Sequence, residues 1–92
     1  MRVTNQVYLE CVTDYSCKDF TIALLDNGDG TWSVARNHGA IGAPTGWSLH
    51  PKARSVSQAA AEKVFDSLRR EKDRHGYVEE SRIPAYLRYT GK

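Results

Sequence analysis

The feature of this sequence that most restricts its fold is the segment Asp-Asn-Gly-Asp-Gly at residues 26–30. Its overlapping Asn-Gly and Asp-Gly pairs readily adopt the positive φ angles that tight turns between antiparallel strands require. Two runs that favour strands flank the turn: residues 20–25 alternate in side-chain character, and residues 31–36 place Trp32 and Val34 on one face. The three segments together predict a β-hairpin.

Two further segments favour strands. Residues 7–12 are rich in β-formers, and residues 47–50 alternate until Pro51, which we expect to end that strand. Between the predicted strands, residues 37–46 contain three glycines and a proline. Because glycine permits positive φ and proline lacks a backbone donor, we expect this segment to leave regular strand pairing. At least one of its glycines should have a positive φ or sit where a Cβ would clash.

From about residue 57 to residue 74 the apolar period changes to that of a helix. The apolar stripe consists of Ala60, Ala61, Val64, Phe65 and Leu68. Ser57 is a favourable N-cap, and Ser55 with Gln58 forms an alternative capping box two residues earlier. Gly76 is placed to end the helix. The predicted fold class is α+β, a small antiparallel sheet of four or more strands with one helix packed on a face.

Length and composition favour one soluble domain over residues 1–92. The chain has 40% hydrophobic and 26% charged residues, with no repeat, low-complexity tract or linker. No apolar run approaches the roughly 20 residues of a membrane span, and the first residues do not resemble a signal peptide. Two cysteines are too few for a disulfide scaffold. We therefore expect a reducing, cytoplasmic compartment and no membrane partner.

Positive charge is concentrated in the second half of the chain. The overall net charge is only +2, but residues 1–46 carry three Lys/Arg against five acids, and residues 47–92 carry ten against six. Four cations, Lys18, Arg36, Lys52 and Arg54, flank the glycine-rich segment and could form a phosphate-binding patch. Dispersed surface charge is the alternative interpretation.

Neither a metal site nor a catalytic centre is predicted. Cys11 and Cys17 are six residues apart, which is wider than the spacing of zinc-binding cysteine pairs, and the three histidines are scattered. No nucleophile has a recognisable base beside it in the sequence. We expect a protein without cofactors that is not an enzyme.

Three stretches carry a resemblance to a known family. Residues 16–22 are Ser-Cys-Lys-Asp-Phe-Thr-Ile, and residues 36–46 are Arg-Asn-His-Gly-Ala-Ile-Gly-Ala-Pro-Thr-Gly. The third stretch places Ser57, Ala61, Phe65, Leu68, Glu71, Lys72, Gly76 and Tyr77 at helical spacing. Over residues 7–78 this order resembles the WGR domain, which is named for a Trp-Gly-Arg signature. The resemblance implies the same α+β fold, with residues 79–92 as a C-terminal tail.

WGR domains occur in DNA-damage-activated poly(ADP-ribose) polymerases and in short bacterial proteins, so the resemblance implies a non-catalytic module that binds DNA ends, here of bacterial source. At the signature positions this chain has His38 and Ala40. Histidine can still stack on a sugar or base, whereas alanine cannot supply the charge of arginine. Residues 83–86, Ile-Pro-Ala-Tyr, resemble a segment that follows this domain in some polymerases, which adds Tyr86 to the candidates.

Two functions follow from these observations. The favoured one is binding of nucleic acid, at a DNA end or nick, through backbone contacts. The alternative is a protein–protein interaction adaptor that has lost the DNA-facing signature. The candidate nucleic-acid-binding residues are Lys18, Arg36, His38, Gly39, Trp47, Lys52, Arg54 and Tyr86.

Overall fold

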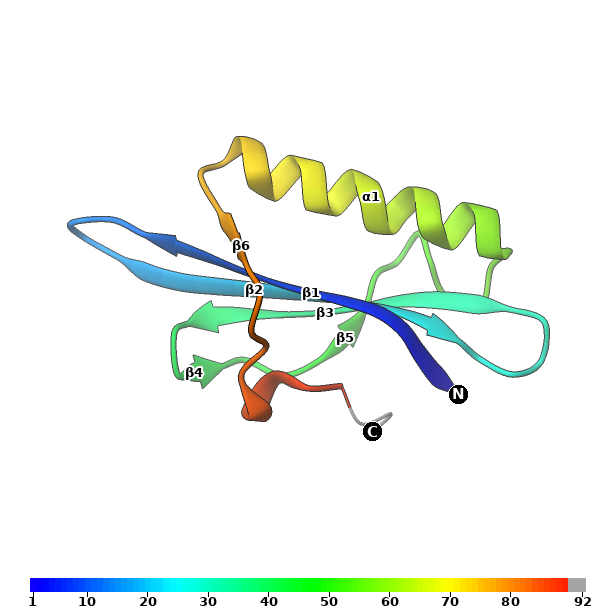
Figure 1. Cartoon of the computed structure of the whole chain (residues 1–92). Coiled ribbons are helices and arrows are strands. Elements are labelled where there is room, and N and C mark those ends of the chain that lie inside the picture. The colour runs from blue at the N-terminus through cyan, green and yellow to red at the C-terminus, as the bar shows by residue number, and fades with distance from the viewer. Residues whose placement is uncertain (90–92) are drawn as a thin grey trace.

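The computed structural model describes residues 1–89, and Figure 1 shows a twisted sheet with a helix across one face. Within these residues, six strands form one antiparallel sheet in the order β4-β3-β2-β1-β6, and β5 also pairs with β3. The elements are β1 (Arg2–Val12), β2 (Cys17–Asp26), β3 (Trp32–Ala40), β4 (Ala43–Pro44), β5 (Ser48–Leu49), α1 (Gln58–Arg74), β6 (Val78–Glu80) and the 3-10 turn η1 (Ala85–Leu87). The predicted α+β class is confirmed.

The predicted hairpin is formed by β2 and β3, whose register pairs Asp26 with Trp32. The connection is a five-residue loop in which the Asn27 N–H donates to the Thr31 carbonyl at 3.0 Å. Gly28 and Gly30 have φ angles of 84° and 89°, which explains why glycine occupies both positions. The Asp26 carboxylate accepts a hydrogen bond from the Gly28 N–H and stabilises the start of the loop.

Helix α1 packs on the face of the sheet that carries alternate residues of β2 and β3. Its buried residues are Ala61, Phe65 and Leu68, as the apolar stripe predicts, and they contact the cluster around Phe20, Ile22, Leu24 and Val34. Of the two predicted starts, the helix uses Ser57, whose hydroxyl accepts from the Ala60 N–H at 3.2 Å. Gly76, with φ 89°, follows the last turn.

The opposite face of the sheet is covered by the C-terminal segment, residues 81–89. In Figure 1 this segment, coloured orange to red, passes beneath the sheet on the side away from α1. Leu87 is fully buried, and its carbonyl accepts a hydrogen bond from the Gln6 side chain at 2.8 Å. Tyr89 packs edge-on against Trp47, with ring centroids 4.9 Å apart. Residues 90–92 of the predicted tail lie outside the described residues.

Some strands are longer than the sequence predicts, and one is shorter. Strand β3 continues to Ala40, and β4 folds back to pair Ala43 with it, so the expectation that residues 37–46 leave regular pairing is wrong for part of that segment. Pro44 is tolerated because β4 lies at an edge of the sheet. The strand predicted over 47–50 is reduced to Ser48–Leu49. Strand β1 begins five residues earlier than predicted, at Arg2.

Among residues 1–89, no helix combines the length and the apolar character that crossing a membrane requires.

Phe65 provides a test of the helix packing, because its side chain is 2% exposed and belongs to the core cluster. Phe65→Ala should lower the free energy of unfolding by about 3–5 kcal/mol, since it leaves a cavity between α1 and β2. Chemical denaturation measures this loss. Ser67→Ala, at an exposed position of the same helix, should change the stability by less than about 0.5 kcal/mol. Equal effects of the two substitutions would contradict this packing.

Candidate functional site

The predicted site residues do not share one surface. Alternation along β2 and β3 places Lys18, Arg36 and His38 on the face that also carries Phe20 and Ile22, beside α1. Trp47 and Tyr86 lie on the opposite face, as do the buried residues of β2 that the C-terminal segment covers. The structure therefore places Lys18, Arg36 and His38 on one face of the sheet and separates them from Trp47 and Tyr86.

His38 is exposed and lies flat against a core aromatic ring. It pairs with Phe20 across β2 and β3, and the two rings are nearly parallel, with an interplanar angle of 9° and centroids 5.8 Å apart. The Lys72 ammonium lies 4.6 Å from the centre of the same Phe20 ring. Phe20 thus supports an exposed imidazole from β3 and a cation from α1.

Arg36, His50 and Lys52 gather where β5 meets β3. Arg36 pairs with Ser48, and the His50 N–H donates to the Val34 carbonyl at 2.8 Å. Burial lowers the pKa of His50, and the positive charges of Arg36 and Lys52 lower it further, whereas Glu71 acts in the opposite direction. The two cations are therefore close enough to His50 for their fields to act on it.

We call this region the basic surface. It comprises Lys18, Arg36, His38, His50, Lys52 and Lys72. Among residues 1–89 the ion pairs are Arg2–Asp26 and Arg69–Glu79, so no carboxylate pairs with the cations of the basic surface. Arg54 is exposed at its margin, two residues beyond Lys52 and next to Ala53, whose carbonyl accepts from the Val34 N–H.

A groove of about 440 Å³ borders the basic surface between α1 and the chain that follows β5. Its apolar lining comes from Ala60, Val64 and Leu68 of the helix. Lys52 and Lys63 add positive charge to the lining, and Glu71 adds one negative charge. This combination suits a ligand with both apolar and anionic groups.

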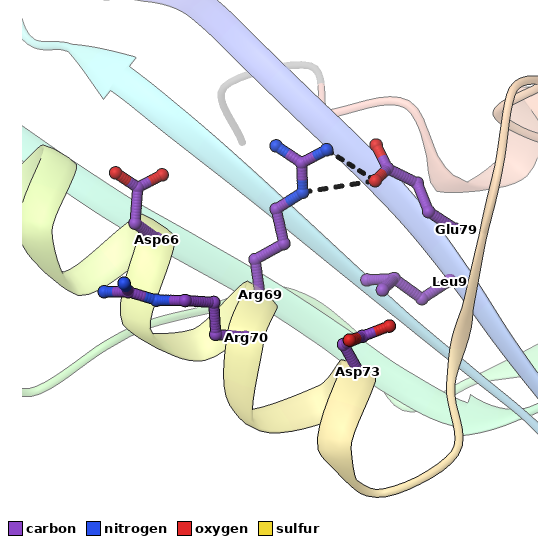
Figure 2. Close-up of a pocket in the computed structure, with 6 residues that line it drawn as sticks. All are labelled: Leu9, Asp66, Arg69, Arg70, Asp73 and Glu79. Carbon is purple, nitrogen blue, oxygen red and sulfur yellow. Dashed lines mark hydrogen bonds and ion pairs between the residues drawn. The ribbon is translucent and has the colours of Figure 1, made fainter.

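A second groove, of about 320 Å³, lies between α1 and the β1–β6 edge and has a different electrostatic character (Figure 2). Here Arg69 reaches from the helix toward Glu79, and its guanidinium donates two hydrogen bonds to one carboxylate oxygen. Asp66 and Asp73 line the same groove. Its positive charge is therefore largely balanced within the protein, unlike that of the basic surface.

A buried polar cluster on the opposite face was missed by the sequence prediction. Asp19 is 1% exposed, and its Oδ2 lies 3.3 Å from the Tyr8 hydroxyl and 3.5 Å from the Tyr86 hydroxyl. Burial raises the pKa of Asp19, although hydrogen bonds from the two tyrosines oppose this shift. The sequence does contain a signal for this cluster, which is an aspartate within the otherwise apolar strand β2. A carboxylate that is buried in a strand rarely lacks a polar partner.

Among residues 1–89, no group of three or more histidine, cysteine, aspartate or glutamate side chains is arranged to hold a metal ion.

Comparison with known proteins gave no match: none to a protein-family model, none to a curated protein and none to a solved structure.

Gly39 connects the basic surface to the polar cluster, because it follows His38 and pairs with Asp19. A Cβ at Gly39 would lie 2.8 Å from the Ala43 carbonyl oxygen, and φ is 155°. The expected close approach at a glycine is therefore confirmed here, and Gly42 and Gly46 have φ angles of 85° and 110°.

Gly39→Ala should destabilise the protein by more than about 1 kcal/mol, the reverse of the usual gain from replacing glycine by alanine. Gly30→Ala is the matched control, since nothing lies within 4 Å of its Cβ position and only its φ of 89° is unfavourable. Thermal unfolding of both variants measures the difference. A Gly39 variant no less stable than the Gly30 variant would show that β4 can move away at little cost.

Proposed function

We propose that this chain is a non-catalytic nucleic-acid-binding module that contacts phosphates through the basic surface. The observation that carries the proposal is that Arg36 and Lys52 both lie near His50, where β5 meets β3, and that neither cation forms an ion pair within the described residues. Repulsion between such charges is relieved when an anion binds among them. Nucleic-acid backbones present anions at regular spacing, which several separate cations can contact at once.

The residue types suit backbone contacts. Arg36 can hold a phosphate through two hydrogen bonds, while Lys18, Lys52 and Lys72 supply charge on flexible stems. His38 offers an exposed ring, supported from behind by Phe20, for stacking on a sugar or base. The resemblance to the WGR domain points to the same class of ligand. The cations of the basic surface would offset the loss of the signature arginine at Ala40.

Two of the predicted contact residues have no place in this proposal. Trp47 packs against Tyr89, and Tyr86 lies beside Asp19, both on the face opposite α1. Their roles are better explained by the attachment of the C-terminal segment. Gly39 acts through the backbone that positions His38, and Arg54 lies at the margin of the surface.

A protein-interaction adaptor is the second candidate, and the groove beside α1 favours it. The apolar floor of Ala60, Val64 and Leu68, next to Lys52 and Lys63, fits a peptide that carries both apolar and acidic side chains. Such a peptide would compete with DNA for the cations at Lys52.

Salt dependence tests the first candidate. Three to four phosphate contacts should give a slope of roughly −3 for log affinity against log salt concentration, and Arg36→Ala should reduce its magnitude by about 1. Fluorescence anisotropy with blunt, nicked and single-stranded DNA at two salt concentrations measures the slope. Arg82→Ala, on the opposite face, is the matched control and should leave it unchanged. No binding to any of the three DNAs at low salt would exclude this function, and binding of an acidic peptide alone would favour the adaptor.

His38 tests whether stacking contributes beside charge. His38→Ala should weaken DNA binding by about 1–3 kcal/mol, whereas His38→Trp should preserve or strengthen it, since a larger ring keeps the stacking surface. The salt slope should stay the same in both variants, since stacking adds no phosphate contact. Equal affinities of wild type and the alanine variant would assign His38 to packing on Phe20 only.

A further inference from the structure

Three close contacts join the hydroxyls of Tyr8 and Tyr86 to the carboxyl groups of Asp19 and Glu10. If both carboxyl groups were ionised, the two hydroxyl protons could form only two of these hydrogen bonds. The Tyr8 hydroxyl lies 2.6 Å from Glu10 Oε2 and 3.3 Å from Asp19 Oδ2. A tyrosine hydroxyl has a single proton and can donate only one hydrogen bond. One further proton must therefore lie on Asp19 or on Glu10, and burial favours Asp19, which is 1% exposed, over the partly exposed Glu10.

The other oxygen of Asp19 points to the same conclusion. Oδ1 is buried and has no hydrogen-bond partner among the described residues. An unpartnered oxygen of an ionised carboxylate in such a place carries a large desolvation cost. In a neutral carboxylic acid, Oδ1 is an uncharged carbonyl oxygen, and the cost is much smaller.

We propose that Asp19 is a neutral carboxylic acid in the folded protein and that its proton latches the C-terminal segment onto the sheet. The hydrogen bonds then form a chain in which Asp19 donates to Tyr8 and Tyr8 donates to Glu10. Tyr86 donates to Asp19 from the C-terminal segment. Loss of the Asp19 proton leaves a buried negative charge that the segment can no longer cover without cost, and the segment detaches.

The latch holds more than one contact in place. The Tyr86 hydroxyl accepts a hydrogen bond from the Gly42 N–H at 3.0 Å, which joins the segment to the β3–β4 turn. Leu87, next in the chain, is fully buried, and Tyr89 packs against Trp47. Detachment would expose the apolar face formed by Ala23, Leu25, Ala35 and Trp47.

The groups around Asp19 act on its pKa in both directions. Burial raises its pKa most, and the charge of Glu10 raises it further, while the hydrogen bond that Tyr86 donates lowers it. Burial also raises the pKa of Tyr8 and of Tyr77, so neither hydroxyl is ionised near neutral pH. Beyond these, the groups that line the adjacent cleft with Tyr8 and Glu10 are Glu80 of β6 and Arg82 of the C-terminal segment.

The sign of the pH dependence follows from the raised pKa. The attached state binds the Asp19 proton more tightly than the detached state, in which aspartate titrates near its ordinary value of about 3.9. The attachment of the C-terminal segment is therefore strongest at a pH below the ordinary pKa of aspartate. It weakens as the pH rises from that value to the raised pKa of Asp19 in the attached state. Within this window the attachment constant falls by up to tenfold per pH unit.

Carbon NMR of the Asp19 carboxyl group, in the wild-type protein from pH 3 to pH 9, tests the protonation directly. Its titration midpoint should lie clearly above about 3.9, the ordinary value for aspartate. Tyr86→Phe should raise the midpoint further, because it removes a donor that favours the ionised form. A wild-type midpoint at or below about 3.9 would overturn the proposal.

Hydrogen exchange tests the latch. Protection factors of the Leu87, Arg88 and Tyr89 amides, corrected for intrinsic rates, should fall in the wild type by up to tenfold per pH unit within the window. Asp19→Asn keeps a neutral side chain with a donor, so its protection factors should not change with pH, and Asp14→Asn should behave as wild type. If Asp19→Asn does not fold, the comparison is made between these amides and those of α1 in the wild type. Tail protection that is independent of pH would overturn the latch.

Discussion

The central strand β2 is buried on both faces, and this constraint determines where the other elements lie. Ile22 and Ala23 are consecutive and point to opposite faces, yet both have no exposed surface. An antiparallel sheet with one helix normally leaves its second face to water. Here α1 covers the Ile22 side, and the C-terminal segment must cover the Ala23 side. The chain thus builds three layers: α1, the sheet and the C-terminal segment. The third layer is irregular and is held by the buried Leu87 and by hydrogen bonds to Gln6.

Local sequence signals were sufficient to predict α1 and the β2–β3 hairpin. Glycines at 28 and 30, the Ser57 cap and the stripe through Phe65 each act within a few residues, so the sequence pattern reports them directly. The third layer lacks such a signal, because residues 81–89 have no apolar period. Leu87 is placed by Gln6, which lies 81 residues away in the chain. The continuation of β3 to Ala40 likewise depends on its pairing with β4. The glycines of residues 37–46 had predicted the opposite, that this segment leaves regular strand pairing.

The candidate site was predictable to the extent that it follows strand alternation. Lys18, Arg36 and His38 share one face because their positions have the same parity in the register of β2 and β3. His50 and Lys72 could not be placed beside them from sequence, because their positions depend on how β5 crosses β3 and how α1 docks. A signal for Lys72 does exist in the sequence. It lies four residues after Leu68, on the helix stripe that faces the sheet, where a lysine must reach toward the edge of the core.

The two faces of the sheet are connected through the β3–β4 turn. On one side, Tyr86 accepts a hydrogen bond from Gly42 at the tip of this turn. On the other, Thr45 at its end donates from both its N–H and its hydroxyl to the His38 carbonyl, at 3.1 and 2.6 Å. The turn is only a few residues long and is held at both ends, so it cannot shift at Gly42 without changing the support of His38. Under the two proposals above, release of the C-terminal segment would therefore loosen the part of the basic surface that carries the exposed ring.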